Sequence, residues 1–293
     1  MDYSDIIEEY PQVHMYYLEE NQGPGMARQY GLEHSSGTYI TFLDSGDYFY
    51  EDGVYTILNQ IKKNTYIKLY TFSYVYDDRN ILSDRPDDKT IGSVYKRSFI
   101  KMYNIHFSKE GSYANEDYGF SRACKLILDY WTSFFFSDAR MHIKIPVFYE
   151  HIDPNSVTKA NNDEFFYTKL SPGIFINGVH AIEIAREAGV PVERLIEEYN
   201  YIMAQEYFFF LCNLYERPTL VDDTWTTIRE FYLNHYKIYE KFALRELPKY
   251  FSQVTLPKIR LQMKRWNNMK NPNILKFVEE LQDNEMTPIR YFQ

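Results

Sequence analysis

Cysteine is scarce in this chain of 293 residues, and its two cysteines, Cys124 and Cys212, lie far apart. Their spacing fits no metal-binding motif, and both sit among large apolar residues. The sequence therefore predicts buried free thiols rather than a disulfide. Free thiols are typical of reducing compartments, which favours an intracellular setting.

Long apolar runs are absent as well. No stretch approaches the roughly 18 uninterrupted apolar residues that a membrane-spanning helix needs. The N-terminus is acidic and lacks the apolar region of a secretion signal. We therefore expect a cytoplasmic protein, in the host cytoplasm if the chain is viral.

Positive charge is in deficit, since 32 Lys and Arg face 41 Asp and Glu, for a net charge of −9. Such a surface does not attract nucleic acid or anionic membranes as a whole. The exception is Leu247 to Val278, which contains seven basic residues, no acidic residue and Trp266. This segment is either a solvated helix face, which is the commoner case, or a contact surface for nucleic acid or membrane.

Tyrosine and phenylalanine are abundant, at 29 and 21 residues. One explanation is the base composition of an AT-rich genome, which agrees with a viral or mobile-element origin. The other is function, because a tyrosine ring offers a sugar both an apolar face and a hydroxyl group. Composition favours the first explanation for most of these residues.

Strand-like and helix-like segments alternate as far as residue 150, as in α/β proteins. The predicted strands are Val13–Leu18, Tyr39–Leu43, Tyr66–Tyr76, Ile91–Tyr95 and Met141–Tyr149, and the predicted helices are Asp2–Tyr10, Met26–His34, Gly53–Lys63, Lys96–Tyr103 and Glu116–Leu128. This alternation predicts a mixed, mostly parallel sheet flanked by helices.

The pattern changes near residues 155–163 and is helical from there on. Helices are predicted at Gly178–Ala188, Pro191–Tyr215 and Thr224–Leu244, followed by two more near 257–269 and 273–283. We expect an α/β domain over residues 1–158 and an all-α C-terminal domain over 159–293.

The segment from Asn21 to Asp47 carries the clearest chemical signal. A glycine-containing loop opens the helix that bears Arg28, and the strand after that helix ends at Asp44 and Asp47. Carboxylates at the C-terminal end of such a strand lie where open α/β sheets bind ligands, and oxygen ligands suit a divalent cation with diphosphate. The simpler alternative is a good turn at Asp44–Asp47, with Arg28 paired to Asp44.

This segment, NQGPGMARQYGLEHSSGTYITFLDSGD, resembles the nucleotide-sugar half of family 2 inverting glycosyltransferases, which have the GT-A fold. Three later segments are similar to that family in the same order: Gly92–Phe107, the Glu116-Asp117 pair, and Val147–Thr158. The resemblance covers about 150 residues and implies a GT-A-like domain of the kind that uses nucleotide-diphosphate sugars.

The resemblance also implies roles for particular residues. Residues matching the donor site are Asn21, Gly23, Arg28, Asp44 and Ser45; those matching a Mn²⁺ or Mg²⁺ site are Asp44, Asp47 and His151. Asp117 matches the general base, with Glu116 beside it. The alternative for that pair is stabilisation of a helix dipole by first-turn acids.

Two departures from the family pattern keep other functions open. Gly46 stands where the family has a metal-binding Asp, and only twenty residues precede Asn21. We therefore expect the usual first strand to be missing, rearranged or supplied by a second chain.

Three functions follow from these observations. The first is an inverting glycosyltransferase that uses a UDP-sugar or a related donor on an unidentified acceptor hydroxyl, with the helical domain positioning the acceptor or mediating association. The second is an inactive GT-A scaffold. The third is a phage-type enzyme that glycosylates hydroxymethylated DNA bases, with the basic segment 247–278 following the phosphates.

Overall fold

The computed structural model describes residues 8–76, 81–83, 89–135, 139–151 and 171–195, together with residues 198 and 202. Several predictions lie outside these residues: the helices predicted from Thr224 onward, the basic segment 247–278, and the surroundings of Cys212. The boundary expected at residue 158 also lies outside them, so the division into two domains stays a prediction. None of the helices in the described part is long and apolar enough to cross a bilayer.

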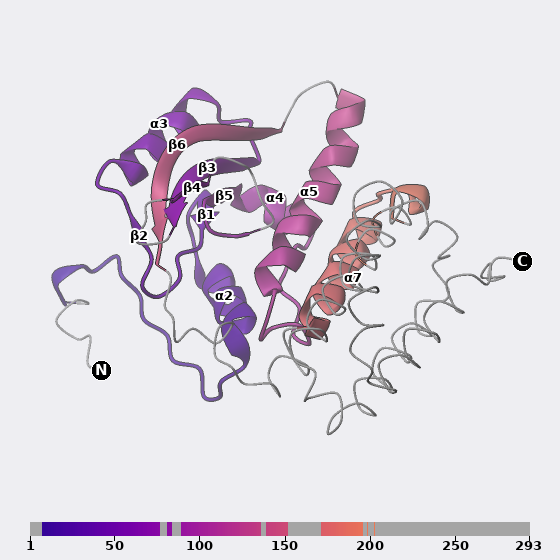
Figure 1. Ribbon diagram of the computed structural model, residues 1–293, viewed down its shortest axis with the longest axis horizontal. Helices are drawn as coiled ribbons and strands as arrows, with labels where there is room; N and C mark the ends of the chain where they lie inside the picture. The colour runs from indigo at the N-terminus through magenta and orange to yellow at the C-terminus, as the bar shows by residue number, and fades with distance from the viewer. Residues whose placement is uncertain are drawn as a thin grey trace, which may run out of the picture.

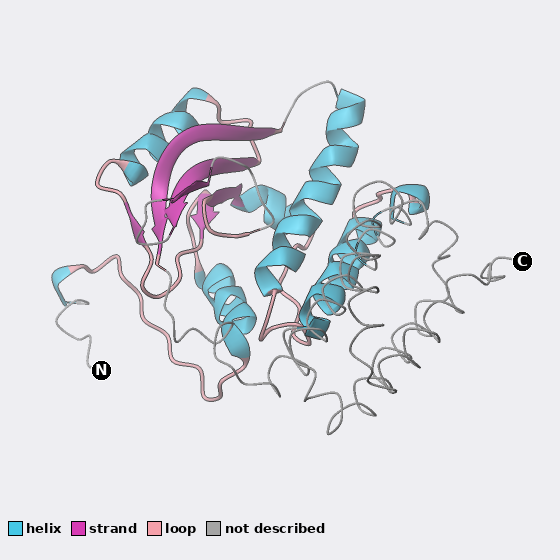
Figure 2. Ribbon diagram, viewed as in Figure 1, coloured by secondary structure: helices cyan, strands magenta, loops and turns pink. Residues whose placement is uncertain are grey.

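One sheet and the helices around it make up the described structure (Figures 1 and 2). In chain order the elements are α2 (Gly23–His34), β1 (Tyr39–Thr41), β2 (Tyr48–Phe49), α3 (Gly53–Lys63), β3 (Leu69–Tyr76), β4 (Ile81–Ser83), β5 (Ser93–Lys96), α4 (Arg97–Met102), α5 (Glu116–Phe135), β6 (Arg140–Glu150) and α7 (Ser171–Glu187). Most predicted elements are confirmed, although α7 begins seven residues earlier than expected.

The sheet has the strand order β1-β5-β3-β6-β2, with β4 paired to β3. Only the β3–β6 pairing is parallel among the strand pairs described. A mixed sheet is confirmed, whereas the prediction that it is mostly parallel is wrong. Between β3 and β5 the described residues contain β4 and no helix, and parallel neighbours require a long crossover connection.

The strand expected at Val13–Leu18 does not form, and this segment contains no strand hydrogen-bond ladder. Its side chains are largely uncovered; Val13, for example, is 37% exposed. A strand depends on a neighbouring strand to accept its backbone hydrogen bonds. In the described part of the chain no strand pairs with this segment, which explains why a strand-like sequence stays irregular.

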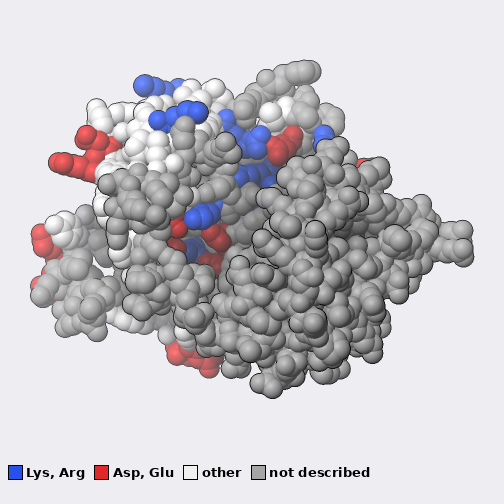
Figure 3. All heavy atoms as spheres, in the orientation of Figure 1, with Lys and Arg blue, Asp and Glu red and all other residues white. Residues whose placement is uncertain are grey.

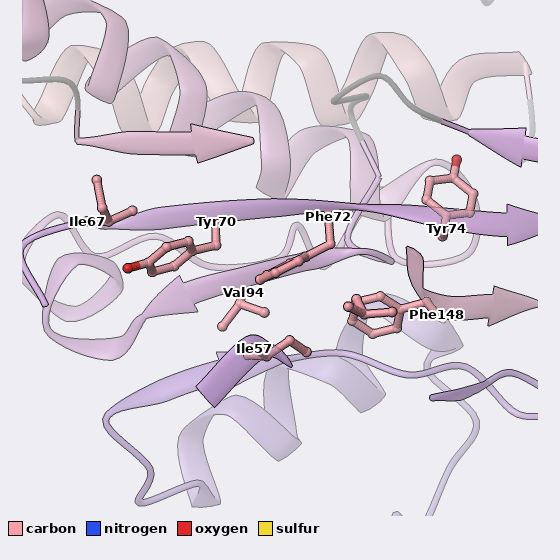
Figure 4. Close-up of a cluster of buried hydrophobic side chains, with 8 residues drawn as sticks. Ile57, Ile67, Tyr70, Phe72, Tyr74, Val94 and Phe148 are labelled. Atoms are coloured by element: carbon pink, nitrogen blue, oxygen red, sulfur yellow. The ribbon is translucent and has the colours of Figure 1, made fainter. Parts of the chain in front are cut away.

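One face of the sheet packs on α3. Alternate residues of β3 point to this face, where Tyr70, Phe72 and Tyr74 join Ile57 of α3 and Phe148 of β6 in a buried cluster. Figure 4 shows the side chains of Phe72, Phe148 and Ile57 close together. The Tyr70 hydroxyl donates to the carbonyl oxygen of Asn64 at 2.5 Å, which joins the sheet to the residue that follows α3.

The opposite face carries an aromatic cluster that sets the geometry of the site described below. Phe42, just after β1, meets Phe120 of α5 edge to face at 5.6 Å between ring centroids, and Phe107 stacks on Phe120 at 4.4 Å. Phe42 lies two residues before Asp44, and Phe120 lies one helical turn after Glu116. The cluster therefore fixes the end of β1 relative to the start of α5.

Behind this cluster, Cys124 of α5 is a buried free thiol, as predicted for that residue, and burial raises its pKa.

Helices α5 and α7 lie side by side (Figure 1). Their contact depends on glycine: a Cβ atom on Gly119 would lie 2.8 Å from the Cβ of Asn177, and one on Gly173 would lie 2.5 Å from the carbonyl oxygen of Ala114. Since real Cβ contacts are never this short, the two helices can approach this closely only with glycine at these positions.

Candidate active site

The loop at the start of α2 binds to a second loop, residues 108–115, instead of standing open. The amide groups of Gly25 and Met26 donate to the carbonyl oxygen and the Oγ of Ser112, each at 2.9 Å. The amide of Gly23 donates to Asn21 Oδ1 at 3.0 Å. The N-terminus of a helix can bind phosphate through such amides, but here they have protein acceptors.

Gly23 itself has a φ of +83°, and a Cβ atom there would lie 2.7 Å from the Ser112 carbonyl oxygen. Only glycine satisfies both conditions. The glycine thus allows α2 to dock against the 108–115 loop.

Arg28 is the centre of the site. Its guanidinium donates to Asp44 Oδ1 at 2.5 Å and to Glu116 Oε1, and its side chain is only 13% exposed. Burial works against the charge of Arg28, but the two carboxylates outweigh burial and raise its pKa. The ion pair between Arg28 and Asp44 that the sequence suggested is therefore present, and Arg28 also holds the acid that opens α5.

Glu116 and Asp117 occupy the first turn of α5. Burial, reinforced by the charge of Glu116, raises the pKa of Asp117 to about 7, against the opposing effects of Arg28, the Tyr118 amide and Lys89. The Tyr118 amide donates to Asp117 Oδ1 at 2.9 Å. A carboxylate with a pKa near neutrality is suited to accept a proton at physiological pH.

The residues after β1 form the turn that the sequence also allowed. The Asp47 amide donates to the Asp44 carbonyl oxygen at 3.1 Å, and Gly46 between them has a φ of +96°. An aspartate at position 46 would be strained in this left-handed conformation, which gives a physical reason for glycine there. Asp47 Oδ1 accepts a hydrogen bond from the His151 amide at 2.8 Å, so His151 does lie beside this turn.

Asp47 differs electrostatically from an ordinary surface aspartate. Burial raises its pKa, with further increases from Asp44 and Glu150, against the His151 amide hydrogen bond and the His151 side chain. Among the described residues, no three His, Cys, Asp or Glu side chains stand close enough to hold a metal ion. Asp44 and Asp47 nevertheless supply the hard oxygen ligands that fit a divalent cation bound mainly through a substrate's phosphates.

Sequence analysis missed three residues of the site: Lys89, Glu150 and Ser112. Lys89 Nζ donates to both carboxylate oxygens of Glu150, at 3.0 and 3.1 Å. The charge of Lys89 lowers the pKa of Asp117, and the charge of Glu150 raises the pKa of Asp47. Glu150 ends β6 much as Asp44 follows β1, so its position at a strand end was a usable signal; Lys89 and Ser112 lie in loops without a local pattern.

These contacts bring the predicted acids together. Asp44 and Glu116 share Arg28, while the Lys89–Glu150 pair links Asp47 to Asp117 through electrostatic interactions. Figure 3 shows acidic and basic side chains gathered around a hollow near the centre of the visible face. The site therefore contains two cations, Arg28 and Lys89, and five carboxylates: Asp44, Asp47, Glu116, Asp117 and Glu150. This excess of negative charge favours the binding of a metal cation together with an anionic substrate.

Residues 2–124 match the sequence model of glycosyl transferase family 2. An uncharacterized glycosyltransferase of Haemophilus influenzae is 31% identical over 137 residues, which are 41% of this chain and 52% of that protein. A Bacillus subtilis protein named as glycosyltransferase EpsH is 23% identical over 193 residues, 57% of this chain and 54% of that protein. The chain thus spans about half the length of these curated relatives.

The fold matches a crystal structure of Staphylococcus aureus TarS in complex with UDP. The TM-score is 0.57 at 15% sequence identity, over 90% of this chain and 75% of that one. The described sheet and helices are therefore GT-A-like, as the sequence predicted. The resemblance to glycosyl transferase family 2 that the sequence predicted is thus confirmed for residues 2–124.

Proposed function

We propose that the protein is an inverting glycosyltransferase that moves a sugar from a nucleotide-diphosphate donor to an acceptor hydroxyl. The contact of Arg28 with both Asp44 and Glu116 carries this proposal, because it joins the donor-side turn to the helix that bears the base. Family membership supports sugar transfer as the reaction. The UDP bound to the similar TarS structure favours a UDP-sugar as donor.

Asp117 is the general base in this proposal. Its carboxylate takes the proton of the acceptor hydroxyl while that oxygen attacks the anomeric carbon of the donor. The bond between the anomeric carbon and the diphosphate oxygen breaks in the same step, and the nucleoside diphosphate leaves with the bonding electrons. A single displacement inverts the anomeric configuration. The pKa of about 7 supports this role, because ionised and protonated Asp117 are then both populated near neutral pH.

Asp44 and Asp47 would hold Mn²⁺ or Mg²⁺ together with the donor diphosphate, with His151 beside them. The metal, when bound, would neutralise charge on the leaving diphosphate. Arg28 orients Asp44 for this task. Lys89, which is paired with Glu150, adds a second positive charge that acts on Asp117.

Asn21, Gly23 and Ser45 belong to the donor side of the proposal in different ways. Asn21 and Gly23 shape the loop that places α2 and so Arg28. Ser45 follows Asp44 in the turn, next to where the ribose and diphosphate would lie.

Nucleotide binding and turnover test the proposal directly. Isothermal titration of the full chain with UDP, with and without Mn²⁺, should show metal-dependent binding, and a panel of UDP-sugars should yield released UDP. Asp117→Asn should keep the binding and lose the turnover. Glu110→Gln, a change at an exposed acid outside the group of site residues, is the matched control and should keep both.

A chain that binds no nucleotide under these conditions would overturn the enzyme proposal. That result would favour the inactive GT-A scaffold, which Gly46 and the engaged amides of Gly25 and Met26 specifically support. A cytoplasmic location is part of the proposal as well, and cell fractionation tests it.

A further inference from the structure

Asn177, in the middle of α7, lies outside the residues that match the family and is completely buried. Its side-chain amide Nδ2, whose two N–H groups are shared among the acceptors, lies within hydrogen-bond distance of three carbonyl oxygens: Gly111 at 3.0 Å, Ala114 at 2.9 Å and Gly173 at 2.9 Å. Gly173 is one turn back in the same helix, whereas Gly111 and Ala114 belong to the loop that precedes α5. One side chain of α7 therefore binds both ends of the segment 111–114.

The second polar atom of the side chain, Oδ1, indicates that this position requires a hydrogen-bond donor. The Oδ1 of Asn177 is buried and has no hydrogen-bond partner among the described residues. A buried acceptor without a partner destabilises a fold, and an apolar side chain of similar size would avoid that cost. Asparagine at this position is therefore explained by its donor group and not by packing alone.

Close packing leaves Asn177 no freedom to move. A Cβ atom on Gly111 would lie 2.5 Å from its amide group, and one on Gly119 would lie 2.8 Å from its Cβ atom. The amide is thus held between the 108–115 loop on one side and the second turn of α5 on the other. Its orientation follows from these contacts.

The segment held by Asn177 contacts both halves of the active site. Ser112, between Gly111 and Ala114, accepts the amide hydrogen bonds of Gly25 and Met26 at the start of α2, and its hydroxyl donates to the carbonyl oxygen of Gln22. Arg28 follows in the same helix. Two residues after Ala114, α5 begins with Glu116 and Asp117.

We propose that Asn177 is a positioning residue that fixes the 111–114 segment, and through it the start of α2 relative to the start of α5. In this arrangement α7 completes the active site without touching a substrate. The consequence for sugar transfer rests on the proposed function; the consequence for the geometry of the loop does not. The two can therefore be tested separately.

The geometric part is tested by hydrogen exchange on the full chain. Asn177→Ala removes the donor group that the three carbonyl oxygens share, and the amides of Gly25 and Met26 should exchange at least about tenfold faster, since their acceptor is no longer held in place. Asn177→Ser is the milder variant. Its hydroxyl reaches the carbonyl one turn back, at Gly173, and not the loop, so it should show the same faster exchange while α7 keeps its packing.

A matched control separates positioning from general loosening. Ile184→Ala creates a cavity at another buried site of α7, two turns further along. It should lower the melting temperature without changing exchange at Gly25 and Met26. Unchanged exchange at these two amides in Asn177→Ser, or an equal increase in Ile184→Ala, would overturn the proposal.

The kinetic part of the proposal is tested by comparing kcat with the affinity for the donor nucleotide. A misplaced base lowers the rate of the chemical step by up to about 100-fold for a shift near 1 Å, so kcat should fall at least about tenfold in Asn177→Ser. The affinity for UDP with Mn²⁺ should fall by a smaller factor than kcat, because donor binding also depends on Asp44 and Asp47, which lie outside the loop and α2, whereas Asp117 follows the loop directly. Equal loss of kcat and donor affinity would contradict this role. If the wild-type chain shows no turnover, the proposed function fails, and the exchange data still decide whether Asn177 positions the loop.

Discussion

The two acids that contact Arg28, Asp44 and Glu116, stand in opposite environments. Asp44, on the donor side, has 57% of its side chain exposed, whereas Glu116, on the acceptor side, has 8% exposed and Asp117 beside it has a pKa raised to about 7. An exposed carboxylate stays ionised and exchanges water for a cation at little cost. A buried carboxylate is strongly destabilised when charged, which brings its protonation into the physiological range.

A single arginine, Arg28, pairs with an acid in each of these environments. Arg28 contacts the exposed Asp44 and the buried Glu116. In the proposed mechanism the exposed Asp44 belongs to donor binding and the buried Glu116 lies beside the base, although both side chains are carboxylates. The predictions below test whether this division of roles is real.

The largest expected effect is on the rate of sugar transfer and follows from replacing the proposed base, Asp117. Asp117→Asn keeps the acceptor oxygen for the Tyr118 amide but cannot take a proton, so sugar transfer should fall by about 10²- to 10⁴-fold. Donor affinity, measured by titration with UDP and Mn²⁺, should stay within about twofold, since general-base loss affects only the chemical step. Retained turnover would remove the distinction between the two sides.

Arg28→Met should have the next largest effect, on the free energy of unfolding. It leaves Glu116 buried without its cationic partner, a loss of about 3–5 kcal/mol measurable by urea unfolding. The double variant Arg28→Met/Glu116→Gln should recover most of that loss, because the buried charge is then gone. A double variant no more stable than Arg28→Met would show that Glu116 does not depend on this pairing.

Asp44 and Asp47, on the proposed donor side, should govern metal-dependent donor binding. Asp47→Asn should weaken UDP binding in the presence of Mn²⁺ by about tenfold or more and leave metal-free binding unchanged. Asp52→Asn, at an exposed acid beyond the turn, is the control and should bind like the wild type. Equal weakening with and without Mn²⁺ would assign Asp47 to the structure of the turn instead of to the metal.

Stability should also depend on pH through Asp117. Its folded-state pKa of about 7 lies above the ordinary value of 3.8, so between these pH values the folded state binds a proton that the unfolded state does not. The wild type should therefore lose stability as pH rises from 4 to about 7, and Asp117→Asn should not. Thermal unfolding of both proteins at pH 5 and pH 8 measures this, and parallel changes in the two would contradict burial of the charge.

The smallest expected effect concerns Lys89. Transfer should rise with pH up to about 7 and then level off, because Asp117 acts only when ionised. Lys89 lowers the pKa of Asp117, so Lys89→Met should move the midpoint of this profile to higher pH. Lys101→Met, at an exposed lysine, should leave the midpoint unchanged. A shift to lower pH would exclude the electrostatic link between the Lys89–Glu150 pair and the base.

Helices, strands and site residues were predicted correctly where short-range sequence patterns define them. The helix at Gly53–Lys63 was predicted with its observed bounds, and Glu116 was placed at the start of a helix, where the structure has it. The strand predicted to run up to Asp44 ends earlier, at Thr41. Sequence analysis failed at Val13–Leu18, where the local pattern is strand-like but no neighbouring strand is available, and at the direction of β5, which depends on how the chain returns from β3.

From the sequence alone came most of the helices and strands, the resemblance to glycosyl transferase family 2 over residues 2–124, and the acidic residues proposed to act in the site, because propensity, periodicity and motif spacing act over a few residues. Only the tertiary structure decided that Arg28 joins Asp44 to Glu116, that Lys89 pairs with Glu150, and that Asn177 holds the loop before α5. Most of these contacts link residues 61 to 88 positions apart. Such pairs meet because of the path that the chain takes through the fold, which no local pattern records.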